Sequence, residues 1–158
     1  MKLPYIIISI IISSVLLVSC TFSETNLPIS PKPSNHFYTE NLFNSLDEYK
    51  EFSSTLYETN LHKESSLDKE DLEVLTNFFS SLNTDDFIDE PYDIDKSPSY
   101  KIFITINSMK YVINIYDADF ISIYPWDGNK QMDFISMKNT PVAYNLYNFC
   151  KYKIDKPL

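Results

Sequence analysis

The chain has 158 residues, with 22 acidic and 13 basic side chains and a formal net charge of −9. Binding to nucleic acid needs clustered cations that displace counterions from phosphates, so this balance excludes a nucleic-acid partner. A single glycine, Gly128, excludes the glycine-rich loops that cradle nucleotide phosphates. Hydrophobic residues make up 44% of the chain, which is ample for one packed core.

The first nineteen residues have the pattern of an export signal. Lys2 supplies a positive charge, and the apolar run Tyr5–Val18 ends at Leu17-Val18-Ser19-Cys20. This stretch resembles the signal peptide of bacterial membrane lipoproteins, and the resemblance covers residues 1–20 only. It implies cleavage before Cys20 and attachment of a diacylglyceryl group, with acyl chains such as palmitate, to the Cys20 thiol. Two or more acyl chains hold a protein stably at a membrane, whereas one does so only marginally.

Two alternatives to this lipid anchor remain open. The segment could be an ordinary signal peptide with an incidental cysteine, or an uncleaved transmembrane helix. The apolar run is shorter than the ~20 residues that a membrane-spanning helix needs. The resemblance favours a cell-membrane protein anchored by Cys20 and facing away from the cytoplasm. The absence of arginine beside abundant lysine, isoleucine and asparagine is typical of an AT-rich genome and indicates a low-GC Gram-positive source.

The segment 20–38 is predicted to be a flexible tether. It carries Pro28, Pro31 and Pro33 among polar residues, and such a composition buries too little apolar surface to fold. Residues 39–158 are predicted to form a single extracytoplasmic domain.

Two helices are predicted in the first half of this domain. The spacing of Leu46, Tyr49, Phe52 and Leu56 predicts a helix over 45–57, with Ser45 and Glu48 as a capping box. A second helix begins after Asp68 as the capping residue, with Leu67 and Leu72 as a hydrophobic staple, and ends near Asn83. We expect these helices to pair as a hairpin.

Alternation of apolar residues predicts four strands in the second half of the chain, over 100–107, 111–117, 120–124 and 132–137. Short turns between them favour an antiparallel meander. A last helix begins at Thr140, with Pro141 in its first position and Val142, Leu146, Phe149 and Cys150 facing inward. The predicted fold class is therefore α+β, with the helix hairpin and the C-terminal helix packed on one face of a four-stranded antiparallel meander.

The acidic loop before the strands is the first candidate for a metal site. Asp93 and Asp95 begin like a calcium loop, but Pro98 stands where that loop needs glycine and Ile104 where it needs a bidentate glutamate. A looser calcium site remains possible, but a solvated acidic loop is the favoured interpretation. The candidate oxygen ligands for such a site are Asp85, Asp86, Asp89 and Asp93.

Catalytic patterns are missing from the sequence. His36 falls in the tether, and His62 alone could act as a base near Ser65 or Ser66. Once Cys20 is acylated, Cys150 is the one remaining thiol, and a small buried residue is its simplest interpretation. The sequence therefore predicts a protein that is not an enzyme and carries no cofactor.

The candidate interaction surface is Tyr124 and Trp126, in the stretch Tyr124-Pro125-Trp126-Asp127-Gly128. Exposed Trp and Tyr are favoured at contacts with proteins and sugars. The alternative is that Trp126 folds back and plugs the open end of the sheet. The predicted function is a non-enzymatic interaction module for another envelope protein. The second hypothesis is a lipoprotein that binds the cell wall or a small ligand, with weak calcium binding in the acidic loop.

Overall fold

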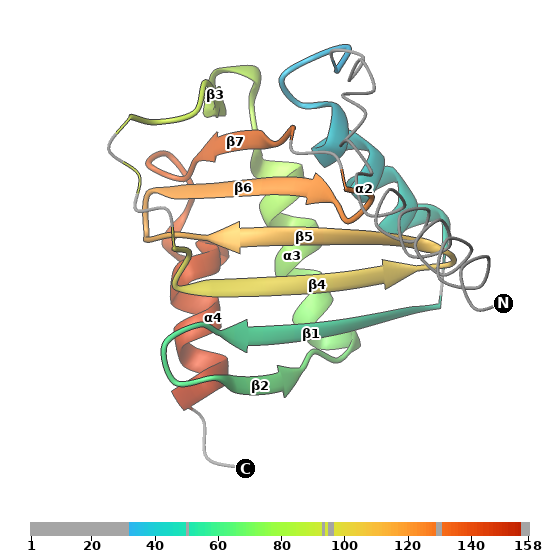
Figure 1. Cartoon of the computed structure of the whole chain (residues 1–158), viewed down its shortest axis with the longest axis vertical. Coiled ribbons are helices and arrows are strands. Elements are labelled where there is room, and N and C mark those ends of the chain that lie inside the picture. Colours follow the sequence, from blue (N-terminus) through green and yellow to red (C-terminus); the bar gives the residue numbers. More distant parts are fainter. Residues whose placement is uncertain (1–31, 50, 93, 95–96, 129–130, 156–158) are drawn as a thin grey trace, which may run out of the picture. The chain divides into compact units, whose positions relative to one another are not determined.

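The computed structural model describes residues 32–49, 51–92, 94, 97–128 and 131–155. In this part of the chain an antiparallel sheet of seven strands has three helices on one face (Figure 1). The strand order is β2-β1-β4-β5-β6-β7-β3. The strands are β1 (Phe52–Glu58), β2 (Lys63–Ser66), β3 (Phe87–Ile88), β4 (Tyr100–Ile106), β5 (Met109–Ile115), β6 (Phe120–Pro125) and β7 (Asp133–Ser136). The helices are α2 (Phe37–Glu48), α3 (Lys69–Ser81) and α4 (Leu146–Asp155).

The core lies between the helices and one face of the sheet. Successive residues of a strand point to opposite faces, and the register places Ile102 opposite Ile113 and Ile113 opposite Ile123. The helices add Leu42, Leu75, Phe78 and Leu146, all fully buried. The isoleucines that face the helices are Ile102, Ile104, Ile106, Ile113, Ile115, Ile121, Ile123 and Ile135, all with no exposed surface.

Helix α3 begins as the sequence predicts. The Asp68 carboxylate accepts a hydrogen bond of 3.0 Å from the Asp71 backbone N–H, and the Asp71 carboxylate accepts one of 2.9 Å from the Asp68 N–H. The first of these bonds holds the pKa of Asp68 below its usual value. Leu67 and Leu72 are both buried, as a hydrophobic staple requires. The capping interpretation of Asp68 is confirmed.

Helix α2 has no local side-chain cap, because its N-cap residue, His36, makes no capping bond. A carboxylate distant in the sequence supplies one instead. Asp133 of β7, which has no exposed surface, accepts bonds of 2.8 Å from the Thr39 N–H and 2.9 Å from the Thr39 hydroxyl. Its other oxygen pairs with the Lys32 ammonium at 2.8 Å. Asp133 therefore joins three segments: the start of the folded unit, α2 and the sheet.

The structure corrects the predicted architecture while leaving the α+β class intact. The four-stranded meander is wrong, because β4 to β7 are continued by the hairpin β1–β2 at one edge and by β3 at the other. The predicted helix over 45–57 is also wrong. Ser45 lies in the last turns of α2, where its hydroxyl bonds to the Asn41 carbonyl, and residues 52–58 form β1. The helical hairpin fails for the same reason, since β1 and β2 separate α2 from α3.

The C-terminal helix starts later than predicted. A 3-10 turn spans Val142–Tyr144, and α4 begins at Leu146. Val142 is 81% exposed and does not face inward, whereas Leu146 and Cys150 are buried in the core. Among the described residues, no helix is both long and apolar enough to cross a membrane.

Candidate binding surface on the helix-free face of the sheet

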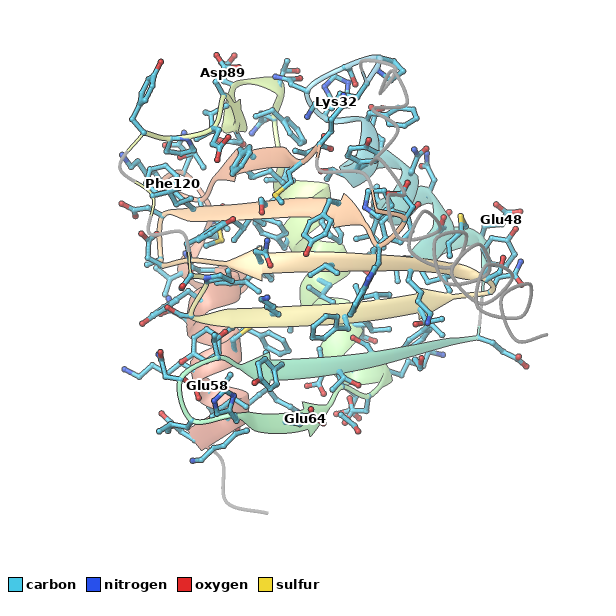
Figure 2. The ribbon with its side chains drawn as sticks, viewed as in Figure 1. Lys32, Glu48, Glu58, Glu64, Asp89 and Phe120 are labelled. Atoms are coloured by element: carbon cyan, nitrogen blue, oxygen red, sulfur yellow. The ribbon has the colours of Figure 1, made fainter. Side chains whose placement is uncertain are left out.

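The face of the sheet turned away from the helices is the candidate site, and it faces the viewer in Figure 2. It is called the open face below. Its side chains alternate along β1, β4, β5 and β6 with those of the core. The residues that define it are Tyr57, Lys101, Phe103, Thr105, Lys110, Val112, Asn114, Tyr116, Ser122 and Tyr124, together with Trp126 just beyond β6.

An aromatic row runs across the open face. Phe103 lies in register with Val112, and Val112 with Tyr124. Trp126 is fixed at the end of β6 by a 2.8 Å hydrogen bond from its backbone N–H to the Lys110 carbonyl. Its ring lies 5.4 Å from the Phe103 ring, and 62% of the residue is exposed. Trp126 is therefore the exposed member of the row, Phe103 and Tyr124 are partly exposed, and Val112 is buried beneath them.

A polar row lies beside the aromatic one. Lys101, Asn114 and Ser122 are in register on β4, β5 and β6. The Asn114 amide donates to Ser122 Oγ at 3.2 Å, and the Tyr116 hydroxyl shares a 3.2 Å hydrogen bond with the same oxygen. The Asn114 side-chain carbonyl is buried without a hydrogen-bond partner among the described residues. Burial raises the pKa of Tyr124, and a hydrogen bond with Asn114 opposes that rise. This row is neutral and internally bonded, apart from its lysine.

On its central strands, the open face carries charges opposite in sign to the net charge of the whole chain. Toward the edge of the sheet, β2 adds the exposed Glu64, which is in register with Tyr57. Between Tyr100 and Ser136, the charged residues within strands are Lys101, Lys110 and Asp133. Asp133 is opposite Ile123 in register and so belongs to the core face. Neither lysine forms an ion pair within the described part of the chain. Strands β4 to β7 therefore present two lysines and no carboxylate on this face.

The two residues predicted as an interaction surface lie together here. Tyr124 belongs to the aromatic row, and the ring of Trp126 packs against that of Phe103 while most of the residue stays exposed. Trp126 therefore does not plug the end of the sheet. The predicted lipid-attachment residue, Cys20, lies outside the described residues.

The acidic loop is used partly for local structure. Asp86 is buried, and its carboxylate accepts a 2.8 Å hydrogen bond from the Asn83 N–H at the start of a 3-10 turn. Asp85 and Asp89 are exposed, while Asp93 lies outside the described residues. Within the described ranges, no group of three or more His, Cys, Asp or Glu side chains is placed to hold a metal ion.

The histidines and the buried thiol are dispersed. His62, in the turn between β1 and β2, is hydrogen-bonded through Nδ1 to the Tyr57 hydroxyl. His36 bonds to Asn35 and lies 3.5 Å from Glu40. Cys150 is fully buried, as the sequence predicts, and burial raises the pKa of its thiol. These groups come from separate elements and do not form one constellation.

Two cavities lie between α2 and α3, of about 240 and 330 Å³. His36, Phe43 and Phe79 contribute to the first, and Tyr49, Phe52 and Leu72 to the second. Their volumes lie below or near the ~300 Å³ lower limit for small-molecule sites. The residues predicted for binding line neither cavity. A third hollow, of about 530 Å³, is formed by the acidic loop, and Asp89 is one of the residues that line it. The open face is the stronger candidate because it brings the predicted residues Tyr124 and Trp126 together with Phe103.

Sequence reasoning missed Lys101, Phe103, Lys110 and Asn114 as members of the site. The signal was present in the alternation that identified Ile102, Ile104 and Ile106 as core residues, because the intervening positions must then share the other face. The contact between Trp126 and Phe103 joins residues that are distant in sequence, and no local pattern predicts it.

Comparison with known proteins places this fold in a family. Residues 32–150 match the family described as "Domain of unknown function (DUF4883)", and the chain belongs to that family. The chain is also similar to a crystal structure of a "Putative Lipoprotein" from Clostridium perfringens, with 36% sequence identity and a TM-score of 0.71. The similarity covers 80% of this chain and 100% of the Clostridium chain. No curated protein sequence matches significantly.

Proposed function

We propose that the protein is a lipoprotein held on the outer side of the cytoplasmic membrane by acyl chains on Cys20. The sequence Leu17-Val18-Ser19-Cys20 supports this proposal, as does the similarity to the Clostridium perfringens protein described as a lipoprotein. That organism is a low-GC Gram-positive bacterium, which fits the source inferred from composition. The folded unit, Lys32–Leu158, lies C-terminal to the anchor and is separated from it by residues 21–31.

The anchor has a direct test. Cys20→Ala in the full chain should abolish acylation, and the protein should leave the membrane fraction. Intact-mass analysis of the wild type should show a processed N-terminus at Cys20 carrying a diacylglyceryl group. A wild-type protein that remains unprocessed, or that fractionates like the Cys20→Ala variant, would overturn the proposed anchor.

The folded domain acts, in this proposal, as a non-enzymatic interaction module that binds another envelope protein through the open face. The observation that carries it is the aromatic row, with Trp126 62% exposed and packed against Phe103 on a face that no described helix covers. Trp and Tyr are enriched among the residues that dominate protein interfaces, because a rigid ring buries much area at little entropic cost.

Photo-crosslinking in living cells tests this function. A photoreactive residue replaces Thr105, which pairs with Lys110 beside the aromatic row, and a matched one replaces the exposed Thr76 on α3. We expect a defined protein adduct from position 105, identified by mass spectrometry, and none of that mass from position 76. Trp126→Ala should remove the adduct at position 105. The same adducts from both positions, or none from position 105, would overturn the proposed interaction.

A further inference from the structure

The chemistry of the partner can be inferred from the charges on the open face, an argument that rests on the function proposed above. The chain carries a net charge of −9, yet its central strands offer only lysines to this face. Lys110 is exposed, Lys101 is half-buried, and neither forms an ion pair among the described residues. Glu64 of β2 lies on the same face, but Tyr57 of β1 stands between it and Lys101. A partner that supplies carboxylates would gain attraction here, whereas it would be repelled by most other parts of the surface.

The register of the sheet sets the spacing of these lysines. Lys101 lies two residues from Phe103 on β4, and Lys110 lies two residues from Val112 on β5. Since Phe103 and Val112 are in register, the lysines lie on opposite sides of the aromatic row. At ~3.3 Å per residue they are about 13 Å apart along the strand direction, with the aromatic row midway.

We propose that the open face binds an extended segment of the partner protein with the pattern acidic, any, apolar, any, acidic. In an extended chain, alternate side chains point to the same side, so residues 1, 3 and 5 of such a segment would share a face and span about 13 Å. Its two carboxylates would meet Lys101 and Lys110, and its central apolar side chain would pack on Phe103 and Trp126. This geometry matches an extended peptide lying along the strands.

The chain provides its own probe for this contact. Trp126 is the single tryptophan, so intrinsic tryptophan fluorescence reports on the open face without a label. The experiment uses the full acylated chain in nonionic detergent with the peptide Ser-Glu-Ser-Leu-Ser-Glu-Ser, capped at both ends. We expect a saturable blue shift of emission, because the leucine would displace water from the indole. The same peptide with Gln or Lys in place of both Glu residues should give at least fivefold weaker binding.

Matched variants locate the charges. Lys101→Gln with Lys110→Gln should weaken binding of the Glu peptide roughly threefold to tenfold, as expected for two ion pairs at the protein surface. Lys69→Gln with Lys151→Gln removes two exposed lysines from α3 and α4, and it should leave binding unchanged. Salt at 0.5 M should reduce the difference between the two variants, because exposed charges are screened.

Several outcomes would overturn the inference. One is that the Glu peptide causes no shift in tryptophan emission. Another is that the Gln peptide binds as tightly as the Glu peptide, and a third is that the two double lysine variants weaken binding equally. A response only to an oligosaccharide of N-acetylglucosamine, only to anionic vesicles, or only to rising protein concentration would identify a glycan, a lipid surface or a second copy as the occupant instead.

The cellular adduct separates this inference from the proposed function. The first outcome is that the double variant Lys101→Gln, Lys110→Gln loses the position 105 adduct. If the control variant Lys69→Gln, Lys151→Gln keeps it, the result supports both the acidic segment and the interaction module. An adduct that survives both pairs of substitutions leaves the interaction module standing and overturns the acidic segment. Absence of the adduct from the wild-type background overturns the proposed function, and the inference with it.

Discussion

The two faces of the central strands consist of alternating residues of the same short segments, yet their environments differ completely. On β4, Ile102, Ile104 and Ile106 have no exposed surface beneath the helices, whereas Lys101, Phe103 and Thr105 between them are partly exposed on the open face. One face therefore supplies most of the hydrophobic stabilisation. The open face contributes less to stability, so its residues can serve binding. Substitutions on the core face should therefore lower stability, whereas substitutions on the open face should chiefly weaken binding.

Each face also contains buried polar groups, and these differ in purpose. On the core face, Asp133 carries a charge that is satisfied by Lys32 and Thr39. On the open face, the network of Asn114, Ser122 and Tyr116 is neutral, and the side-chain carbonyl of Asn114 has no hydrogen-bond partner in the part of the chain that the structure describes. Breaking the charged cluster should cost more stability than altering the neutral one, because removing one partner leaves a buried charge without compensation.

The sharpest comparison of the two faces uses neighbouring residues of β4. Ile104→Ala should lower the free energy of unfolding by about 4 kcal/mol, because it removes a fully buried side chain and leaves a cavity. Phe103→Ala, on the open face, should cost about 1 kcal/mol although it removes a larger side chain, because Phe103 is partly exposed in the folded state. Chemical denaturation of the full chain in detergent measures both. Equal losses would show that the open face is packed like a core.

The next largest effect is expected at Asp133. Asp133→Ala should cost about 3 kcal/mol, because it removes the cap of α2 and leaves the Lys32 ammonium without its partner. Asp133→Asn keeps the shape and part of the hydrogen bonding, so it should be the milder substitution. Denaturation of both variants, with Asp89→Ala as an exposed control, tests this role. A loss below 1 kcal/mol for Asp133→Ala would show that the cluster is not structural.

Asp133 also explains why the first helix was predicted in the wrong place. The signals for α3 are local, since Asp68, Asp71, Leu67 and Leu72 lie within six residues of one another. The cap of α2 instead comes from a residue 94 positions away from Thr39, so no local pattern marks its start. Leu46, Tyr49, Phe52 and Leu56 have helical spacing, but they straddle the end of α2 and the start of β1.

The strands were predictable where both alternation and turns were local. β4 to β7 alternate clearly and are joined in sequence, so their pairing follows from short connections. β1 could not be recognised in the same way, because its inward positions include Ser54 and Glu58 as well as Leu56. β3 has only two residues, and its pairing with β7 is a tertiary contact. For the site, Tyr124 and Trp126 were found from residue type, whereas Phe103 and the lysines required the register.

A smaller effect on stability is expected at alkaline pH from Tyr100, a tyrosine of the core face. Burial and the neighbouring Tyr147 raise the pKa of Tyr100 on the core face to about 12, from an ordinary value of 10. The folded state therefore keeps a proton that the unfolded state loses above pH 10, so the contribution of Tyr100 to stability is complete below pH 10 and falls as pH rises toward 12. Denaturant midpoints between pH 8 and 11 should fall less steeply in Tyr100→Phe. An unchanged slope would show that Tyr100 does not contribute to alkaline unfolding.

The smallest change in stability is expected at Trp126, where the largest change in function is proposed. Trp126→Ala should alter the free energy of unfolding by no more than about 0.5 kcal/mol, because 62% of the residue is already exposed. Tyr152→Ala on α4 is the matched control, since Tyr152 is 63% exposed on the other side of the sheet. Both variants should unfold like the wild type, but only Trp126→Ala should lose the adduct at position 105. If Trp126→Ala were strongly destabilised, the exposed ring would contribute to packing. The proposed division into a stabilising face and a recognition face would then fail, because it depends chiefly on Trp126.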